Sequence, residues 1–362
     1  SYCFIPSDRD DDFSPEVFSA DKPDRALLRE GWRKLLPRAI ADPLNPHSWR
    51  GGRGHGVSAL EMPQAPAQPG WDQLNAAHPP AHCLEWRSAR LGNHRRVWIY
   101  TTGEAVDPQT RPLAILLDGQ FWAESMPVWS PLAALTNEGS LPPAVYLLID
   151  AIDNQRRGVE LPCHRDFWLA VQEELLPLVR GHAPFSDRPD RTVVAGQSFG
   201  GLAAMFAALN WPQRFGCVLS QSGSYWWPHR DGCGTGFIGE QLRQGEVSAA
   251  GLRVWLEAGG KSANIVFADC PDLQQAASAT AAGIFYNQVQ VCIAGTRLLM
   301  EESIADEFLA LLKQQAQNWQ PGHPLDPATT MGTLIDCAHA DSVHSFIREG
   351  ESKGQLLLDG RN

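Results

Sequence analysis

One short stretch constrains the fold of this chain more than any other: Gly196-Gln197-Ser198-Phe199-Gly200. The apolar run before it (192–195) favours a strand, and the alanine-rich run after it (202–209) favours a helix. A serine in a G-x-S-x-G turn between a strand and a helix is typical of a nucleophile elbow. Such a turn is tight, so both glycines are expected where backbone segments crowd together. We therefore predict that Ser198 is a nucleophile; an ordinary serine in a glycine-rich turn is the alternative.

Apolar runs on both sides of the elbow predict a mostly parallel sheet. The expected strands are 96–102, 113–117, 144–149, 191–195, 217–222 and 252–257. The second and third of these runs are continuously apolar, as in strands that are buried on both faces. Helical patterns lie between the strands, notably over 167–179. The alternation predicts the α/β class and, with the elbow, an α/β-hydrolase-like core over residues 83–258. Residues 1–82 carry little periodicity beyond a short helix predicted at 25–34.

Composition excludes several classes of function. The net charge of -11 disfavours nucleic acid as a partner. No apolar run is long enough to span a membrane, and no secretory signal is visible. The eight cysteines occur singly, without a C-x-x-C pair. We therefore expect reduced thiols, no metal site and a cytoplasmic location.

The ends of two predicted strands offer groups for binding and catalysis. Asp118-Gly119 follows one strand, where the amide of Gly119 would complete an oxyanion hole with the amide of Phe199. A plain turn explains the same two residues equally well. Arg156 and Arg157 follow the next strand, so they are candidates for holding an anionic substrate, although most arginine pairs are simply solvated.

An aromatic cluster, Tyr225-Trp226-Trp227, follows the strand after the elbow helix. It fits either the core or a pocket for a ring-bearing substrate, and Trp226 is the candidate for contact with substrate.

Residues 1–259 resemble the enterochelin (ferric enterobactin) esterase family. The matching stretches include Glu30-Gly31-Trp32-Arg33-Lys34, Ile40-Ala41-Asp42-Pro43-Leu44, Leu116-Leu117-Asp118-Gly119, the elbow itself, and Arg214-Phe215-Gly216 through Trp227-Pro228-His229. The resemblance implies a serine esterase that hydrolyses the ester bonds of a ferric catecholate siderophore in the cytoplasm. Iron would then enter only as part of the substrate, with no resident cofactor. It also implies that residues 1–82 are the last piece of an N-terminal β-rich domain and a linker, without that domain's start.

Residues 256–362 resemble an internal piece of an aldehyde dehydrogenase, in particular enzymes acting on γ-glutamylated aminobutyraldehyde. Leu256-Glu257-Ala258-Gly259-Gly260-Lys261-Ser262 matches that family's L-E-L-G-G-K-S motif, and 287–297 matches its N-Q-G-Q-x-C segment, with Val289 in place of a glycine. The resemblance implies Cys292 as a thiol nucleophile and Glu257 as a general base, with NAD as the cofactor. Aldehyde oxidation nevertheless requires a nicotinamide site, and residues 1–250 contain no G-x-G-x-x-G between a strand and a helix.

The chain is therefore a hybrid that joins the two resemblances near residue 259. The esterase family places its acid in an R-E-P step, where this chain has Lys261-Ser262, and its histidine in a later G-G-H-D segment with no counterpart here. His339 and His344 lie at helical spacing and are expected on a solvated helix face. We therefore expect impaired esterase activity, because a serine hydroxyl needs a base. A dehydrogenase fragment and a siderophore binder without turnover are the alternatives.

The junction also leaves both cores incomplete, so we expect residues 259–362 to form a foreign α/β segment that packs poorly. The sequence indicates no oligomeric state.

Overall fold

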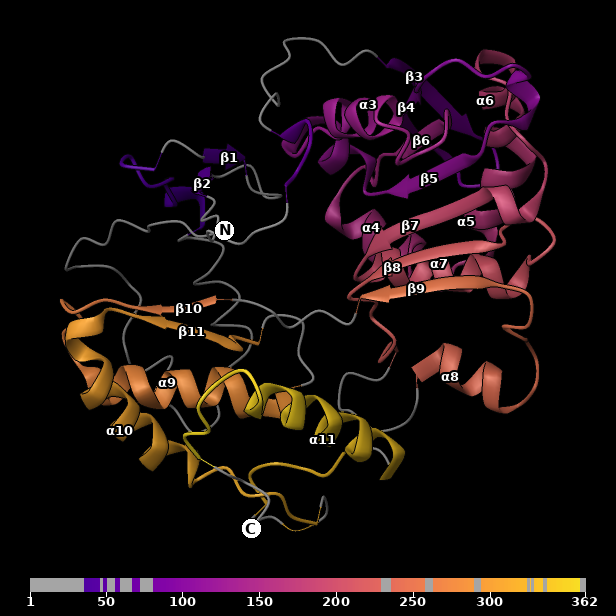
Figure 1. Ribbon diagram of the computed structural model, residues 1–362. Coiled ribbons are helices and arrows are strands. Elements are labelled where there is room, and N and C mark those ends of the chain that lie inside the picture. Colours follow the sequence, from indigo (N-terminus) through magenta and orange to yellow (C-terminus); the bar gives the residue numbers. More distant parts are fainter. Residues whose placement is uncertain are drawn as a thin grey trace. The chain divides into compact units, whose positions relative to one another are not determined.

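A seven-stranded sheet organises the first part of the chain in the computed structural model (Figure 1). The structure describes residues 36–45, 48–50, 56–58, 67–71, 81–228, 236–257, 263–289, 294–323, 326, 329–334 and 337–358. The strands, in spatial order, are β3 (His82–Ser88), β4 (Asn93–Thr101), β6 (Val145–Ile149), β5 (Leu113–Leu117), β7 (Thr192–Gln197), β8 (Cys217–Gln221) and β9 (Arg253–Glu257). β4 is antiparallel to both of its neighbours, and the strands from β6 to β9 are parallel to one another.

Helices cover both faces of this sheet, which explains its continuously apolar strands. In β6, Val145, Leu147 and Ile149 pack into one buried cluster, whereas Tyr146 and Leu148 pack into another on the opposite face. The helices are α3 (Trp129–Asn137), α4 (Asn154–Glu160), α5 (Arg165–Ala170), α6 (Leu176–His182), α7 (Phe199–Asn210) and α8 (Gly236–Arg243). α5, α6 and α7 contribute to the first cluster and α3 to the second. Every residue of α7 from Gly200 to Leu209 is buried, as expected of a helix that is apolar all round.

The strand predictions are confirmed to within a few residues at each end. The predicted helix at 167–179 is part of a longer helical run, in which α5 and α6 are joined by a π-helical turn at Val171–Leu175. β3 was not predicted, because its polar sequence and exposed residues give no apolar run. The predicted helix at 25–34 lies outside the described residues. A small antiparallel pair, β1 (Ser48–Arg50) and β2 (Gly56–Ser58), precedes the sheet.

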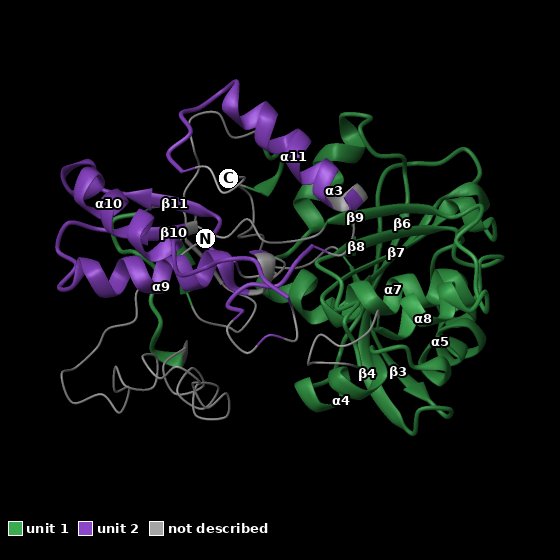
Figure 2. Cartoon of the chain, turned by 90° about the horizontal axis from the view of Figure 1, so that it is seen from below, with its two compact units in different colours: residues 1–257 green, residues 258–362 purple. Residues whose placement is uncertain are grey.

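The chain divides into two compact units, residues 1–257 and 258–362 (Figure 2). The second unit contains the strands β10 (Ala263–Val266) and β11 (Arg297–Met300) and the helices α9 (Leu273–Phe285), α10 (Ala305–Ala316) and α11 (Cys337–Glu351). β10 and β11 pair in parallel and are joined through α9. Their core is small: Val266, Ala277, Ile304 and Phe308 are its buried members.

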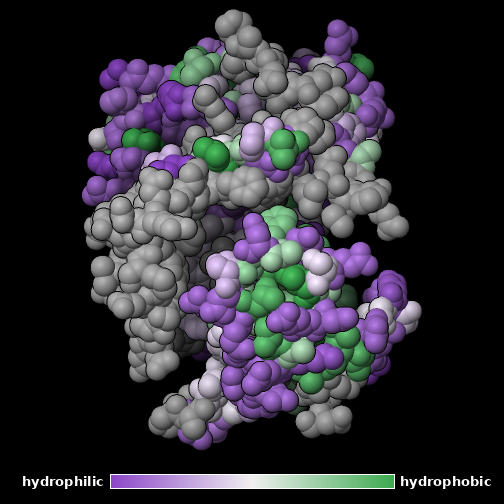
Figure 3. Space-filling view, turned by 90° about the vertical axis from the view of Figure 1, so that its left-hand side faces the viewer, coloured by the Kyte–Doolittle hydropathy of each residue, from purple (hydrophilic) through white to green (hydrophobic). Residues whose placement is uncertain are grey.

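Large hydrophobic side chains remain exposed in the second unit, among them Phe267 and Phe346. Figure 3 shows hydrophobic residues gathered among hydrophilic ones on one face of the molecule. The segment thus has an α/β core of its own, with few residues in it. Among the described helices, none is long and apolar enough to cross a membrane.

Because the core of the second unit is small, we expect a single substitution in it to unfold that unit. Phe308→Ala removes a fully buried ring and is expected to cost about 3–5 kcal/mol, which so small a core cannot offset. Limited proteolysis should then cut within residues 258–362 first and leave a resistant fragment ending near Glu257. Phe346→Ala is the matched control, because that ring is 70% exposed. Equal resistance of both units in the Phe308 variant would contradict this prediction.

Candidate functional site

The predicted elbow is present at the junction of β7 and α7. Ser198 lies between the last residue of β7 and the first residue of α7, with φ 55° and ψ -117°, and its side chain is exposed. This positive φ is unfavourable for a residue with a Cβ atom, so the surrounding structure must hold it. Ser198 N–H donates to the carbonyl of Gln221 (3.0 Å), and the carbonyl of Ser198 accepts from Leu202 N–H (3.0 Å). The backbone therefore fixes the turn and leaves the hydroxyl outside.

Close backbone crossing explains the glycines around the serine. A Cβ atom on Gly196 would lie 2.4 Å from the carbonyl carbon of Gly200, so no side chain fits there. Gly201 is equally restricted, because its Cβ would lie 2.6 Å from Ser220 Oγ. At Gly200 the nearest atom would be Asp118 Oδ2 at 3.4 Å, which is an ordinary contact. The expected lack of room for a side chain is thus confirmed at Gly196 but not at Gly200. The backbone of Gly200 is the group against which Gly196 packs.

Two backbone amides remain the candidates for the oxyanion hole. β5 pairs in parallel with β7, so the residues that follow them, Asp118-Gly119 and Ser198, emerge at the same edge of the sheet. Phe199 is the first residue of α7, and the first amides of a helix have no partner within the helix. Gly119 is buried, and a Cβ atom there would lie 2.5 Å from the amide nitrogen of Ile149. The roles of Gly119 and Phe199 remain predictions.

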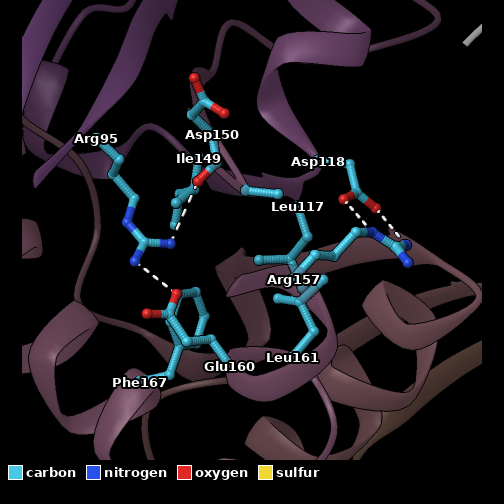
Figure 4. A pocket seen from close by; sticks show the side chains of 10 residues that line it. Arg95, Leu117, Asp118, Ile149, Asp150, Arg157, Glu160, Leu161 and Phe167 are labelled. Atoms are coloured by element: carbon cyan, nitrogen blue, oxygen red, sulfur yellow. Dashed lines mark hydrogen bonds and ion pairs between the residues drawn. The ribbon is translucent and has the colours of Figure 1, made fainter. Parts of the chain in front are cut away.

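Arg157, which the sequence suggested as a contact for substrate, is held by the protein itself. Its Nε and Nη2 atoms donate to the two carboxylate oxygens of Asp118 at 2.6 and 2.8 Å (Figure 4). Nη2 also donates to the carbonyl of Gln197 at 3.1 Å, directly before the nucleophile. One guanidinium thus ties the end of β5 to the elbow. Arg156, by contrast, is exposed.

A buried ion pair fixes the other end of the helix that carries Arg157. Glu160, the last residue of α4, accepts from Arg95 and Asn93, and both Arg95 and Glu160 are nearly fully buried. Between the two ion pairs lies a pocket of about 10 Å³, which is room for about one water molecule (Figure 4). Arg95 Nε is buried without a hydrogen-bond partner. Removing Glu160 or Arg95 would leave a buried charge unpaired.

The aromatic cluster divides between core and surface. Tyr225 donates to the buried Ser220 Oγ (2.7 Å), and Trp227 packs against Phe237 with ring centroids 5.9 Å apart. Trp226 is 45% exposed, and its ring lies 5.9 Å from that of Phe199, the residue next to the nucleophile. Trp226 and Phe199 therefore form an aromatic wall beside Ser198.

The hydroxyl of Ser198 has a neutral partner. Ser224, which is buried, places its Oγ 3.0 Å from Ser198 Oγ. The four histidines described in the first unit are placed elsewhere: the rings of His82 and His182 lie 6.5 Å apart, His94 lies 3.7 Å from Glu85, and His164 caps α5. His344 is exposed on α11, as expected, whereas the side chain of His339 is outside the described part. A carboxylate–histidine pair at Ser198 is not seen among these residues.

The dehydrogenase-like pair is only half described. Glu257 is the last residue of β9, within the esterase sheet, and its carbonyl accepts from Ser222 N–H. Cys292, Lys261 and His229 lie outside the described residues. Within those residues, no cluster of side chains suited to a metal ion is found.

The described cysteines carry free thiols. Among them, burial raises the pKa of Cys163 to about 12, which makes that thiol unreactive.

The sequence profile of the family described as "Putative esterase" matches residues 88–289, and that of the enterochelin esterase N-terminal domain matches 1–71. The chain belongs to the enterochelin esterase family. The iron(III) enterobactin esterase of Escherichia coli O6:H1 is 65% identical over 269 residues, which cover 74% of this chain and 66% of that protein. The crystal structure of the Shigella flexneri enterobactin esterase in the presence of enterobactin is 55% identical, with a TM-score of 0.61 over 86% of this chain and 76% of that one. The chain thus spans about two thirds of the curated esterases it matches.

The remaining part of the chain has a different relative. The aldehyde dehydrogenase family profile matches residues 234–362. The NADP/NAD-dependent aldehyde dehydrogenase PuuC of Escherichia coli K12 is 90% identical over 124 residues, which are 34% of this chain and 25% of that protein. The hybrid character predicted from the sequence is confirmed, and the dehydrogenase part is a fragment.

The ion pair of Arg157 yields a test of the site. Arg157→Met leaves the Asp118 carboxylate, which is 13% exposed, without its partner and should lower stability by about 1–3 kcal/mol. Because the same guanidinium holds Gln197, we expect labelling of Ser198 by a fluorophosphonate to slow about tenfold, in line with a shift of that size. Arg156→Met is the control, with unchanged melting temperature and labelling. A normal labelling rate in Arg157→Met would show that the ion pair does not shape the elbow.

Proposed function

We propose that this chain is a serine esterase that cleaves the ester bonds of a ferric catecholate siderophore such as enterobactin, in the cytoplasm. The observation that carries this proposal is the exposed Ser198 held at a positive φ between β7 and α7. Its Oγ attacks the ester carbonyl and gives up its proton, the bond between the acyl carbon and the alcohol oxygen breaks, and the freed alcohol takes up a proton. Water then hydrolyses the acyl-enzyme, which restores the Ser198 hydroxyl and releases the carboxylic acid of a catechoyl-serine unit.

Charge that develops on the carbonyl oxygen needs fixed donors. The amides of Phe199 and Gly119 are the proposed donors, and the N-terminus of α7 favours negative charge at the same place. These are backbone groups, so they persist whatever base is available. The binding part of the site is therefore more complete than the proton-transfer part.

Recognition of the substrate is assigned to the aromatic wall and to Arg156. Trp226 and Phe199 place two aromatic rings next to Ser198, which suits contact with catechol rings. Arg156 is exposed at the same sheet edge and suits the negative charge of a ferric catecholate. Arg157 acts indirectly, through Asp118 and the elbow. The siderophore is the partner, and iron belongs to it rather than to the protein.

Turnover is expected to be slow, because the described partner of the serine hydroxyl is another hydroxyl. Enzymes that lose triad members retain about 10³–10⁴-fold rate enhancement from the oxyanion hole and binding alone. Siderophore binding with little turnover is accordingly the second candidate, supported by the exposed Trp226. Aldehyde oxidation is not proposed, since the dehydrogenase part corresponds to a quarter of its relative.

The role of Ser198 as the nucleophile can be tested even if the chain lacks a catalytic base. Because backbone groups hold the turn, a fluorophosphonate should label Ser198 slowly, and Ser198→Ala should abolish the labelling. Ser248→Ala, at an exposed serine of the same unit, should leave it unchanged. Peptide mapping by mass spectrometry identifies the labelled residue. Labelling that persists in Ser198→Ala would exclude the assignment.

Turnover provides a separate test. The chain should hydrolyse a cyclic catechoyl-serine trilactone orders of magnitude more slowly than its full-length relatives, as followed by chromatography of the products. Replacing the residues after Gly259 with the corresponding segment of the Escherichia coli esterase should restore the rate, because that segment carries the family's histidine and acid. Full-speed, Ser198-dependent hydrolysis by the unaltered chain would mean that another residue serves as base. NAD and an aldehyde should yield no reduced cofactor.

A further inference from the structure

β9 forms one edge of the seven-stranded sheet (Figure 1). β8 pairs with one side of β9, and within the described residues no strand pairs with the other side. Val254, Trp255 and Leu256 are 39%, 55% and 55% exposed, so apolar groups are exposed on both faces of the strand. An edge of this kind is a template for pairing with another strand.

The hydrogen bonds to β8 determine which backbone groups face the open side. Arg253 N–H donates to the carbonyl of Gly216 (2.9 Å), and Ser222 N–H donates to the carbonyl of Glu257 (2.6 Å). In a parallel ladder, alternate residues direct both of their backbone groups to the same neighbour. Arg253, Trp255 and Glu257 therefore face β8, whereas Val254 and Leu256 direct their N–H and C=O groups to the open edge.

The sequence of β9 is complementary to itself when it is read in the opposite direction. Centred on Trp255, an antiparallel arrangement places Arg253 opposite Glu257 and Val254 opposite Leu256. The two residues with outward backbone groups then form the hydrogen-bonded pairs, and each such pair exchanges two bonds. Arg253, Trp255 and Glu257 occupy the other sites, where facing side chains approach most closely. Opposite charges therefore face each other at the two ends of the paired segment, and apolar side chains face one another at its three central positions.

We propose that β9 pairs in antiparallel fashion with β9 of a second copy of this chain, about a twofold axis at Trp255. Such a contact joins the same surface of both copies, so it closes at two. An interface of five residues per copy buries less surface than the roughly 1,000 Å² expected of a stable interface. The dimer is therefore reversible and depends on concentration. This inference is independent of the esterase proposal.

Charge reversal tests the register directly. Sedimentation velocity across the micromolar range should show a monomer–dimer equilibrium for the unaltered chain. Arg253→Glu and Glu257→Arg each place like charges opposite one another twice per dimer, and each should shift dissociation at least tenfold toward monomer. The double variant Arg253→Glu/Glu257→Arg restores opposite charges and should restore the dimer. Arg87→Glu, on the exposed surface of β3 at the other edge, is the control and should still dimerise.

A cross-link tests the axis. In the proposed dimer, Trp255 lies opposite Trp255 of the second copy. Cβ atoms of residues opposed in this way lie about 4.5–5.5 Å apart, which is close to the Cβ–Cβ range that a disulfide spans. Trp255→Cys should give a disulfide-linked dimer on mild oxidation, whereas Val254→Cys, opposite Leu256, should not. Circular dichroism and an unchanged melting temperature confirm that each variant folds.

Three outcomes overturn the proposal. A monomer at every concentration would show that β9 does not pair with a second copy. A dimer unaffected by Arg253→Glu would place the interface elsewhere. Oligomers that grow beyond two copies would exclude closure about a twofold axis.

Discussion

The crossing of β7 and α7 is the constraint on which the site depends. Gly196 and the backbone of Gly200 approach so closely that a single added carbon would collide, and this approach forces Ser198 into its unfavourable conformation. Such strain persists only where surrounding structure over-determines it. Here the supports are a helix buried along nearly its whole length, the bond from Ser198 to Gln221, and the guanidinium of Arg157 on the carbonyl of Gln197. Ser198 is thus positioned by packing as much as by its own hydrogen bonds.

The junction near residue 259 separates the residues that position Ser198 from the part of the chain in which the family is expected to carry its proton-transfer residues. Everything that presents the serine lies before residue 258 and is in place. The resemblance implies a histidine and its carboxylate after that point, where this chain has a segment with a different relative and a core of its own. In the proposed mechanism, binding and oxyanion stabilisation rest on residues before the junction, whereas proton transfer rests on residues that the family carries after it. We therefore expect a hybrid of this kind to keep the first and to weaken the second.

The sequence predicted the sheet and the elbow well because both have local signals. Runs such as 113–117 are apolar without interruption, and a G-x-S-x-G turn requires a particular backbone. β3 gave no such signal, since its alternating polar residues sit at an exposed edge. The contacts of Arg157 were also missed, because a bidentate pair with Asp118 joins residues 39 positions apart in the chain and no local pattern encodes it. Similarly, nothing in Tyr225-Trp226-Trp227 tells which ring faces outward until the partners Ser220 and Phe237 are known.

The two ion pairs of α4 have a consequence for motion. Its seven residues are too few for a stable helix on its own, and it is anchored by Arg157 at one position and Glu160 three residues later. Opening of this helix of about two turns would release both anchors together, and with them the carbonyl that precedes Ser198. Amide hydrogen exchange in α4 and at the elbow should therefore belong to one cooperative opening unit, so that a helix with no atom at the reacting centre sets how often the nucleophile loses its geometry.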